Sequence, residues 1–437
     1  MKNFLLVLSI VSFVAAPYGS STAAGLGAPL QIAYNVGLNY GNDGHDLADP
    51  HLTTVNGSHY DFQSAGEFVD LRDSQGMEVQ TRKTAITTDV PGTGPHAGAL
   101  CASINTAVAA RVGSHRVTYE PSAVAGAGMQ LRIDGVPSTL GAQGVTFASG
   151  GHVGNTPLGT GIDVDFTDGS SMTVTANDWP QQSTTYLNVS VFHTPATEGI
   201  LGHVVPGGWI PALPNSSLMG PQPTAAHQLY VDLYQTFANA WRVTNATSLF
   251  DYAPGTSTAT FTFPVWPSEK GPCFAPKSNP GRHLAHDAAQ KMCNEVADKN
   301  RNANCVFDVA ATGAQAFVKG YLLTQRLEAG ATRVVVGDEK GTTITGAPAT
   351  FTATVRRQSS SGGGAPVGSV QFTIDGSRAG DAVKLDGDGR AMFQTSRLPA
   401  GKHQVSARYI AAEGSVFLPS SSLDAVHTVI KGGPRTQ

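Results

Sequence analysis

The sequence predicts a mostly β protein, with antiparallel sandwiches and a small mixed α/β segment, and two observations indicate this. The first is composition: the 437 residues include 50 glycines and 26 prolines, and only 14% are charged. This balance suits many short strands joined by turns better than long charged helices. The second is strict alternation of apolar and polar residues, as in residues 162–166, which is typical of a half-buried strand.

The bulk properties also restrict the function and the location. A net charge of −4 and the lack of a dense Lys/Arg cluster argue against a nucleic-acid partner. Residues 1–24 are typical of a secretory signal peptide, because Lys2 precedes an apolar run at 4–16 and small residues at 20–24. That run is too short to span a bilayer, and no later segment is long and apolar enough to do so. We therefore expect an exported protein, in the medium or the periplasm, without a membrane span.

Residues 25–47 form a lead-in with weak signals, and residues 48–213 have the pattern of many short strands. The Asp134-Gly135 and Asp168-Gly169 dipeptides are typical of hairpin turns. We expect an antiparallel meander folded into a sandwich of two sheets. The Pro/Gly/Ser-rich residues 206–223 read as a long surface connection. The strands are expected near residues 68–71, 77–82, 84–89, 108–112, 116–119, 131–133, 162–166, 172–174 and 186–192.

Residues 214–330 form a mixed block with most of the helix and three of the four cysteines. Helical spacing is expected over 286–297 and 314–327. The cysteines are Cys101, Cys273, Cys293 and Cys305, and export favours their oxidation to disulfides. Three connectivities are possible, and we favour Cys293 paired with Cys305 or with Cys273. Zinc held by His283, His286, Cys293 and Cys305 is a weaker alternative, because only the histidines are closely spaced.

Residues 331–431 have about seven alternating strands in about one hundred residues, which predicts an immunoglobulin-like sandwich. The run at 366–372, the Leu-Pro-Ala-Gly at 398–401 and the strand containing Tyr409 resemble the bacterial Ig-like repeats of surface proteins. The resemblance implies a spacer that presents another domain.

Residues 48–63, followed by Gly66-Glu67-Phe68, resemble the opening of a von Willebrand factor type D domain. The segments 237–243, 248–252 and 304–309 are similar to the block that follows such domains in mucin-like proteins. The resemblance implies an extracellular, β-rich, non-enzymatic module of adhesive or matrix proteins.

The resemblance also raises the question of calcium, which many type D domains hold. Asn56 stands at one family ligand position, and the others follow a Gly-Leu-x-Gly motif, here at 199–202. The following loop, 203–209, has no carboxylate and no Asn, so we expect no cofactor, with calcium as the alternative. Asp43 and Asp46 could also supply oxygen ligands, but they read more simply as part of a solvated loop.

Some type D domains with a Gly-Asp-Pro-His motif cleave themselves between Asp and Pro. The matching residues here are Asp49, Pro50 and His51, but Ala48 replaces the glycine. We expect an intact chain in which the motif starts the sheet and His51 is buried and hydrogen-bonded. Self-cleavage at Asp49 is the alternative.

No nucleophile elbow, zincin motif or phosphate-binding loop is present in the sequence, and Asp163 and Asp165 read as the solvent face of a strand. We therefore expect a non-enzymatic binding, adhesion or matrix-scaffolding protein. Its partner would be an extracellular or cell-surface protein or glycan, and Trp209 is the candidate contact residue. One alternative is a secreted hydrolase acting on polysaccharide or peptide, and another is a structural protein that polymerises through Cys101.

Overall fold

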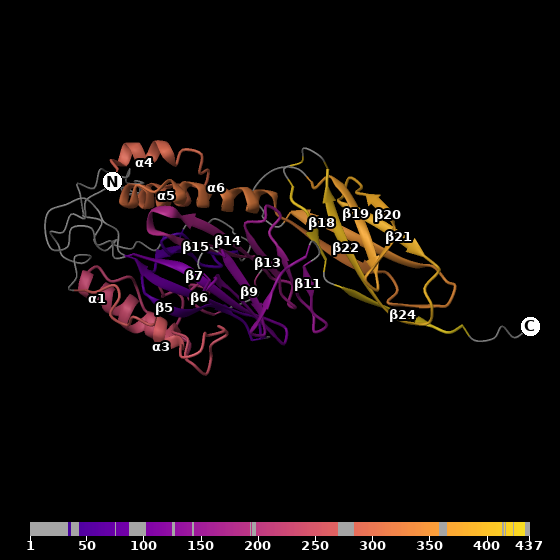
Figure 1. Cartoon of the computed structure of the whole chain (residues 1–437), viewed down its shortest axis with the longest axis horizontal. Helices are drawn as coiled ribbons and strands as arrows, with labels where there is room; N and C mark the ends of the chain where they lie inside the picture. Colours follow the sequence, from indigo (N-terminus) through magenta and orange to yellow (C-terminus); the bar gives the residue numbers. More distant parts are fainter. Residues whose placement is uncertain are drawn as a thin grey trace, which may run out of the picture.

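The computed structural model describes residues 34–35 and 43–432, apart from 75, 87–101, 125–126, 142–143, 193, 195–197, 270–283, 358–364, 413–414, 416 and 423. The expected signal peptide, Cys101 and Cys273 lie outside the described residues. Figure 1 shows a large two-sheet module with helices on two sides, followed by a second, smaller β domain. The chain is mostly β, as the sequence predicts. Among the helices described, none is long and apolar enough to cross a membrane.

The large module is built from two antiparallel sheets. The first runs in the order β1-β4-β3-β2-β15-β14-β13-β12-β11, and the second is the meander β10-β9-β8-β7-β6-β5. In the first sheet the strands are β1 (Tyr34–Asn35), β2 (Gly44–Leu47), β3 (His51–Thr53), β4 (Ser58–Asp61), β11 (Val145–Thr146), β12 (His152–Asn155), β13 (Gly161–Asp165), β14 (Ser171–Trp179) and β15 (Thr184–Phe192). In the second they are β5 (Gly66–Arg72), β6 (Glu78–Ile86), β7 (Ala102–Val112), β8 (His115–Pro121), β9 (Met129–Ile133) and β10 (Val136–Ser138).

Local sequence explains much of this arrangement. Asp134 and Gly135 join β9 to β10 with φ values of 51° and 83°, the left-handed pair that a tight hairpin requires. Alternating apolar side chains from both sheets form one buried core that includes Phe62, Phe68 and Val189. Burial of such rings and branched side chains contributes about 2 kcal/mol each. The meander and the sandwich were therefore predicted correctly.

The structure corrects the sequence prediction at strands β2 and β6. Gly44–Leu47, which the sequence places in a lead-in, is strand β2, and it pairs with β15 and β3. The two strands expected at 77–82 and 84–89 are one strand, β6, whose register shifts between Arg82 and Lys83. This bulge interrupts the alternation at Lys83, and an interrupted alternation reads as a strand end.

Helices cover both sheets on their outer sides (Figure 1). Trp179 and Tyr186 of the first sheet pack on Phe317 of α6. The helix expected at 314–327 is therefore present as α6, whereas α5 was not predicted. The helices are α1 (Ala226–Tyr230), a π-helical stretch (Val231–Phe237), α2 (Ala238–Trp241), α3 (Thr258–Phe261), α4 (His286–Met292), α5 (Lys299–Thr312) and α6 (Gln315–Gly330), with a 3-10 turn at Pro180–Gln182.

The second domain is a sandwich of two sheets that begins almost directly after α6. That helix ends at Gly330 and β16 begins at Thr332, so the expected boundary at residue 331 falls between them. Its core includes Phe351, Phe372 and Tyr409. One sheet has the order β16-β18-β21 and the other β17-β24-β22-β19-β20, with β23 beside β22. The strands are β16 (Thr332–Asp338), β17 (Thr342–Ile344), β18 (Ala349–Arg357), β19 (Gly368–Ile374), β20 (Ser377–Lys384), β21 (Arg390–Thr395), β22 (Gly401–Ala411), β23 (Ser420–Ser421) and β24 (Ala425–Ile430).

Candidate functional site

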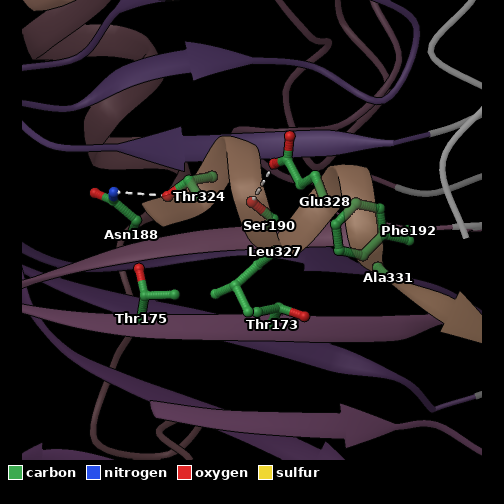
Figure 2. A pocket seen from close by; sticks show the side chains of 9 residues that line it. All are labelled: Thr173, Thr175, Asn188, Ser190, Phe192, Thr324, Leu327, Glu328 and Ala331. Carbon is green, nitrogen blue, oxygen red and sulfur yellow. Dashed lines mark hydrogen bonds between the residues drawn. The ribbon is translucent and has the colours of Figure 1, made fainter. Parts of the chain in front are cut away.

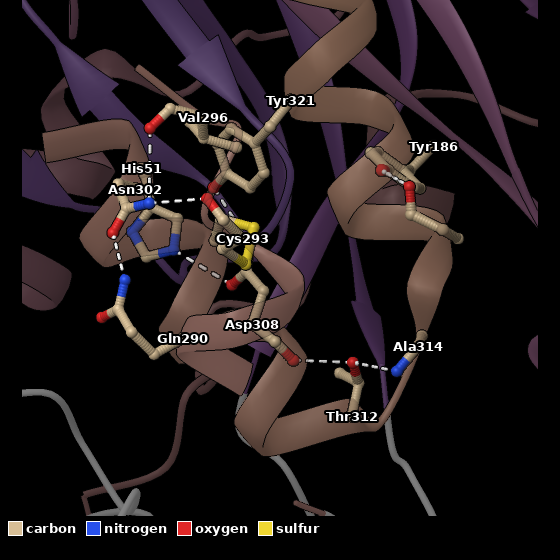
Figure 3. Close-up of a disulfide and its surroundings, with 12 residues drawn as sticks. His51, Tyr186, Gln290, Cys293, Val296, Asn302, Asp308, Thr312, Ala314 and Tyr321 are labelled. Atoms are coloured by element: carbon tan, nitrogen blue, oxygen red, sulfur yellow. Dashed lines mark hydrogen bonds and ion pairs between the residues drawn. A yellow bond between two sulfur atoms is a disulfide. The ribbon is translucent and has the colours of Figure 1, made fainter. Parts of the chain in front are cut away.

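A buried histidine lies between two carboxylates where the first sheet meets α5. His51 Nδ1 is 2.6 Å from Asp61 Oδ1, and His51 Nε2 is 3.1 Å from Asp308 Oδ1. The hydroxyl of Tyr321 on α6 donates to Asp308 Oδ2 at 2.9 Å. Figure 3 shows His51, Asp308 and Tyr321 converging beside the disulfide that links α4 to α5. This cluster joins groups that are 257 positions apart in the chain.

The charges of this cluster are set by burial and by the ion pairs. Burial alone would lower the pKa of His51, but Asp61 and Asp308 outweigh it and hold that pKa well above 6.5. Burial, together with the charge of Asp308, raises the pKa of Asp49 well above 3.8. The side-chain amide of Gln63 donates to Asp49 Oδ1. Both shifts favour the protonated forms of the imidazole and of the Asp49 carboxyl, which lie close together in the interior.

Among the described residues, Asp49, His51 and Asp308 of this cluster lie close enough together to hold a metal ion. Ligand atoms of Asp49, His51 and Asp308 all lie within 4.8 Å of one another. Both imidazole nitrogens already face carboxylates, so a metal would have to displace one of these hydrogen bonds. No pattern in the sequence indicated Asp61, Asp308 or Tyr321 as members of the cluster. The only local signal for the cluster was the Asp49-Pro50-His51 motif.

The backbone before Asp49 has the shape that a glycine would favour. Ala48 has a φ of 57°, a left-handed conformation that costs a residue with a Cβ about 1 to 2 kcal/mol. Its N–H donates to the side-chain oxygen of Asn188 at 2.8 Å, and this bond helps to hold the turn. Ala48 thus adopts a backbone conformation that a glycine would reach without this cost. His51 is buried and hydrogen-bonded, as the structural interpretation of the motif expects.

We predict that the Asp49-Pro50 bond stays intact. Self-cleavage would require Asp49 to attack its own backbone carbonyl, but Gln63 and the surrounding core hold its carboxyl in the hydrogen-bond network. Purified protein held at mildly acidic pH should therefore run as one full-length band on a denaturing gel. Two fragments that meet at Asp49-Pro50 would instead establish self-processing. A His51→Gln variant separates the two cases, because only a self-cleaving chain would change its band pattern.

The other candidate metal ligands are not members of this cluster. The side-chain oxygen of Asn56 accepts from the N–H of Val204 at 3.1 Å, and its amide donates to the carbonyl of Val204 at 2.8 Å. Asn56 therefore ties its turn to the loop that follows residues 199–202. Asp43 and Asp46 are buried, at 6% and 0% exposure, and not in the solvated loop that the sequence indicated. The expectation of no cofactor, with calcium as the alternative, stays a prediction.

Trp209 does not lie on the surface, which corrects the expectation that it contacts a partner. Its side chain is 6% exposed and packs in the core of the large module. An irregular Pro- and Gly-rich segment can still bury an aromatic ring, because one large apolar side chain stabilises a segment that has no regular backbone hydrogen bonds. The segment around Trp209 is therefore anchored to the module at this point.

One of the two favoured cysteine pairings is present. Cys293 and Cys305 form a disulfide with a Cα–Cα distance of 6.0 Å. Because both sulfurs are bonded to each other, these two residues cannot serve as thiolate ligands, and the zinc interpretation is wrong for them. His283 lies outside the described residues. His286 is exposed and its imidazole is 3.7 Å from Asp287.

A cleft lies between the large module and the second domain. Its volume is about 320 Å³, and strands β12 to β14 form one wall. Strands β16 and β22 form the other, with the side chains of Arg333 and Arg408. Asp163 and Asp165 of β13 point into this cleft from the same strand face. They are half-buried rather than on an open solvent face, which corrects the sequence interpretation.

Burial shifts both carboxyls of the cleft toward their neutral forms. It raises the pKa of Asp163 to about 6, although a hydrogen bond from Thr173 opposes this. It raises the pKa of Asp165 to about 7, with the charge of Asp163 acting in the same direction and Arg333 opposing. The cleft therefore offers carboxyl, hydroxyl and guanidinium groups near neutral pH, which suits hydrogen bonding to a polar ligand.

We predict that these two carboxyls make the folded protein less stable as pH rises. The pKa values of both carboxyls are higher in the folded protein than the ordinary value of 3.8, so the folded state binds more protons than the unfolded state. This proton binding stabilises the folded state at low pH, and the stabilisation is lost as pH rises from about 3.8 to about 7. A variant with Asp163→Asn and Asp165→Asn should lose less stability than the wild type over that interval in urea denaturation. Asp178→Asn, at an exposed position of β14, is the control and should keep the wild-type slope. An unchanged slope in the double variant would refute this.

A small pocket continues from this cleft beneath α6. Figure 2 shows Asn188 bonded to Thr324 and Ser190 bonded to Glu328, so that polar pairs join β15 to the helix. The pocket has a volume of about 10 Å³, which is about the space of one water molecule. The pocket is a packing gap between helix α6 and the sheet, too small to hold a larger ligand.

Comparison with known proteins identifies the second domain. Residues 336–430 match the family model of the bacterial Ig-like domain (group 3), which confirms the expectation for the C-terminal part. A search of the curated proteins finds no match. The resemblance of residues 48–68 to type D domains stays a prediction.

Two solved structures are similar at low scores. One is the CARDB domain of a Pyrococcus furiosus protein in complex with di-metal ions, at 14% identity and a TM-score of 0.18, covering 23% of this chain and 94% of that one. The other is a polysaccharide lyase, at 10% identity and a TM-score of 0.21, covering 93% of this chain and 47% of that one. Scores this low carry no argument about the fold or the function.

Proposed function

We propose that this protein is an exported, non-enzymatic adhesion or matrix-scaffolding protein. The observation that carries the proposal is the bacterial Ig-like domain at residues 336–430, which follows the large module after a single residue beyond α6. Ig-like domains on many proteins act as spacers. Here a short connection and a shared cleft would let the domain hold the module at a fixed orientation, which suits presentation of a binding surface.

The finer identity of the large module is part of the same proposal. The resemblance of residues 48–68 to a type D opening supports an extracellular assembly or binding module. Asn56, Ala48 and residues 199–202 support it further, because the turn, the left-handed backbone and the loop contact occur together around the motif. The partner is an extracellular or cell-surface glycan or protein, and the cleft beside Asp163 and Asp165 is where we place its contact.

Surface attachment by a deletion strain, with the purified full-length mature protein added back, tests the function. Attachment should fall in the deletion strain and recover with wild-type protein. The variant Asp163→Asn with Asp165→Asn should restore less, whereas Asp178→Asn should restore attachment fully. Unchanged attachment in the deletion strain would contradict the adhesive role. Full recovery with the cleft variant would place the contact elsewhere.

One observation favours a second candidate, a secreted hydrolase. Two carboxyls whose pKa values are raised to about 6 and about 7 share the cleft, and glycoside hydrolysis uses a pair of carboxyl groups of which one acts as a general acid with a raised pKa. Incubation of the protein with a panel of soluble polysaccharides, followed by a reducing-end assay, tests this. Turnover that disappears in both single variants, Asp163→Asn and Asp165→Asn, would favour the hydrolase over the scaffold.

A further inference from the structure

A lysine is completely buried between the two sheets of the large module. Lys83 and Asp46 are both 0% exposed. Lys83 belongs to β6 of the second sheet and Asp46 to β2 of the first, so the ion pair between Nζ and Asp46 Oδ2 spans the core. Nζ also donates to the side-chain oxygen of Asn105 at 2.8 Å. A lysine is rarely buried to this degree, because removing its charge from water is costly.

A second carboxyl completes the group. Asp70 of β5 is 0% exposed and accepts a hydrogen bond from Thr81 at 2.5 Å. Asp46 Oδ1 and Asp70 Oδ2 are both buried without a donor, which is costly for ionised carboxylates. A proton on Asp70 would let its carboxyl donate to Asp46. Burial raises the pKa of Asp70 well above 3.8, and the charge of Asp46 acts in the same direction although Lys83 opposes it.

We propose that Lys83 and Asp46 become joined by an amide bond between Nζ and Cγ, with Asp70 as the proton carrier. The bond would link β6 to β2 and thereby tie the two sheets together covalently. An amine and a carboxyl that the fold holds in contact react as if at very high concentration, because the entropy of bringing them together is already spent. This inference concerns the folded module and does not depend on the proposed adhesive role.

The reaction balances without any co-reactant. The ammonium of Lys83 gives one proton to the Asp46 carboxylate, which produces a neutral amine and a neutral acid. The nitrogen lone pair then attacks Cγ and the new C–N bond forms. Asp70 donates its proton to the departing hydroxyl, the C–O bond breaks, and one water molecule leaves. Asp70 recovers a proton from the nitrogen, so it ends in its starting state.

The product removes an electrostatic cost from the core. A neutral amide replaces the buried ammonium and carboxylate. The attraction within a buried ion pair often fails to offset the free energy needed to remove both charges from water. The bulge between Arg82 and Lys83 is part of the arrangement, because it shifts the register where Lys83 enters the core. Asn105 is the cross-strand partner of Lys83, and it would hold Nζ in position for the attack.

Peptide mapping of the mature wild-type protein tests the bond. The protein is reduced, denatured, and digested with trypsin and a second protease. We expect no tryptic cleavage after Lys83, and a peptide pair joined through Lys83 and Asp46 whose mass is one water less than the sum of the two. Complete cleavage after Lys83, with both peptides at their unmodified masses, would overturn the proposal. A link from Lys83 to Asn105 with loss of ammonia would overturn Asp46 as the acceptor.

Two variants test the role of Asp70. Asp70→Asn keeps the shape of the side chain and removes its exchangeable acid proton, so the yield of linked peptide should fall about 100-fold. Glu67→Gln, a buried carboxyl on the same strand that pairs with Arg82 instead, should leave the yield at the wild-type level. An Asp70→Asn protein with native circular dichroism and a full yield would overturn the assignment of Asp70. If that variant does not fold, the wild-type map still decides whether the bond exists.

Discussion

Replacement of Asp308 with alanine should lower the free energy of unfolding by about 4 kcal/mol. The carboxylate accepts from His51 Nε2 at 3.1 Å and from the Tyr321 hydroxyl at 2.9 Å, and it is 1% exposed. The substitution leaves two buried donors without an acceptor and removes one of the charges that holds His51 protonated. Each unsatisfied group costs about 1 to 3 kcal/mol. Urea denaturation followed by tryptophan fluorescence measures the loss.

The stability loss caused by Asp308→Ala should also depend on pH. The pKa of His51 is raised well above 6.5 in the folded protein. Its stabilisation is therefore fully present below the unfolded value of 6.5 and is lost as pH rises through the folded value. The difference between wild type and Asp308→Ala should accordingly shrink as pH rises above 6.5.

Two control variants show how much of the stability loss in Asp308→Ala comes from the ion pair with His51. Tyr321→Phe removes one donor and leaves the pair with His51 in place, so it should cost about 1 kcal/mol. Asp178→Ala, at an exposed carboxyl of β14, should change stability by about 0.5 kcal/mol or less. A deficit in Asp308→Ala no larger than in Tyr321→Phe, or one that is independent of pH, would show that the ion pair with His51 contributes little.

The parts of the fold that could be predicted are those with local signals. Alternation located β13 and β15, and the Asp134-Gly135 dipeptide marked its hairpin, because backbone geometry at such positions depends on neighbouring residues alone. In the C-terminal domain the same signals sufficed to predict a sandwich of about seven strands, although not the bounds of each strand. Helix α5 was missed because its first turns are rich in Asn, which favours helices weakly. Asp298 caps it by accepting from the N–H groups of Asn300 and Arg301, and packing stabilises the rest.

The candidate sites could be predicted only in part, because their partners come from distant segments. His51 was identified from its motif, but Asp308 lies in a helix that the sequence did not indicate. Strand β2 was read as a loop because His45 and Asp46 are polar, and polar residues in sequence are usually exposed. In the structure Asp46 is paired with Lys83, so the rule fails where ion pairs fill the core. Likewise, Asp163 is covered by a domain that no alternation pattern of β13 can reveal.

The second large effect is expected at Gly199, where replacement with alanine should lower the free energy of unfolding by about 4 kcal/mol. Residues 198–202 run along β5: the N–H of Ile200 donates to the carbonyl of Val69 at 3.1 Å, and that of Leu201 to Asp70 at 2.8 Å. Gly199 has a φ of 131°, and an added Cβ would lie 2.4 Å from the carbonyl oxygen of Asp70. Backbone atoms cannot move aside as a flexible side chain can, so Gly199→Ala must break this contact.

Gly207→Ala separates the two causes of that cost. Gly207 also has a positive φ, 94°, but the nearest atom to an added Cβ is Leu218 Cδ1 at 3.5 Å, an ordinary contact. This variant should therefore lose only the conformational part, about 1 to 2 kcal/mol. The excess in Gly199→Ala measures the close approach of the 198–202 segment to β5. Equal losses in the two variants would mean that the segment moves away from β5 at little cost, and that the loop bound by Asn56 is not fixed by its contact with the sheet.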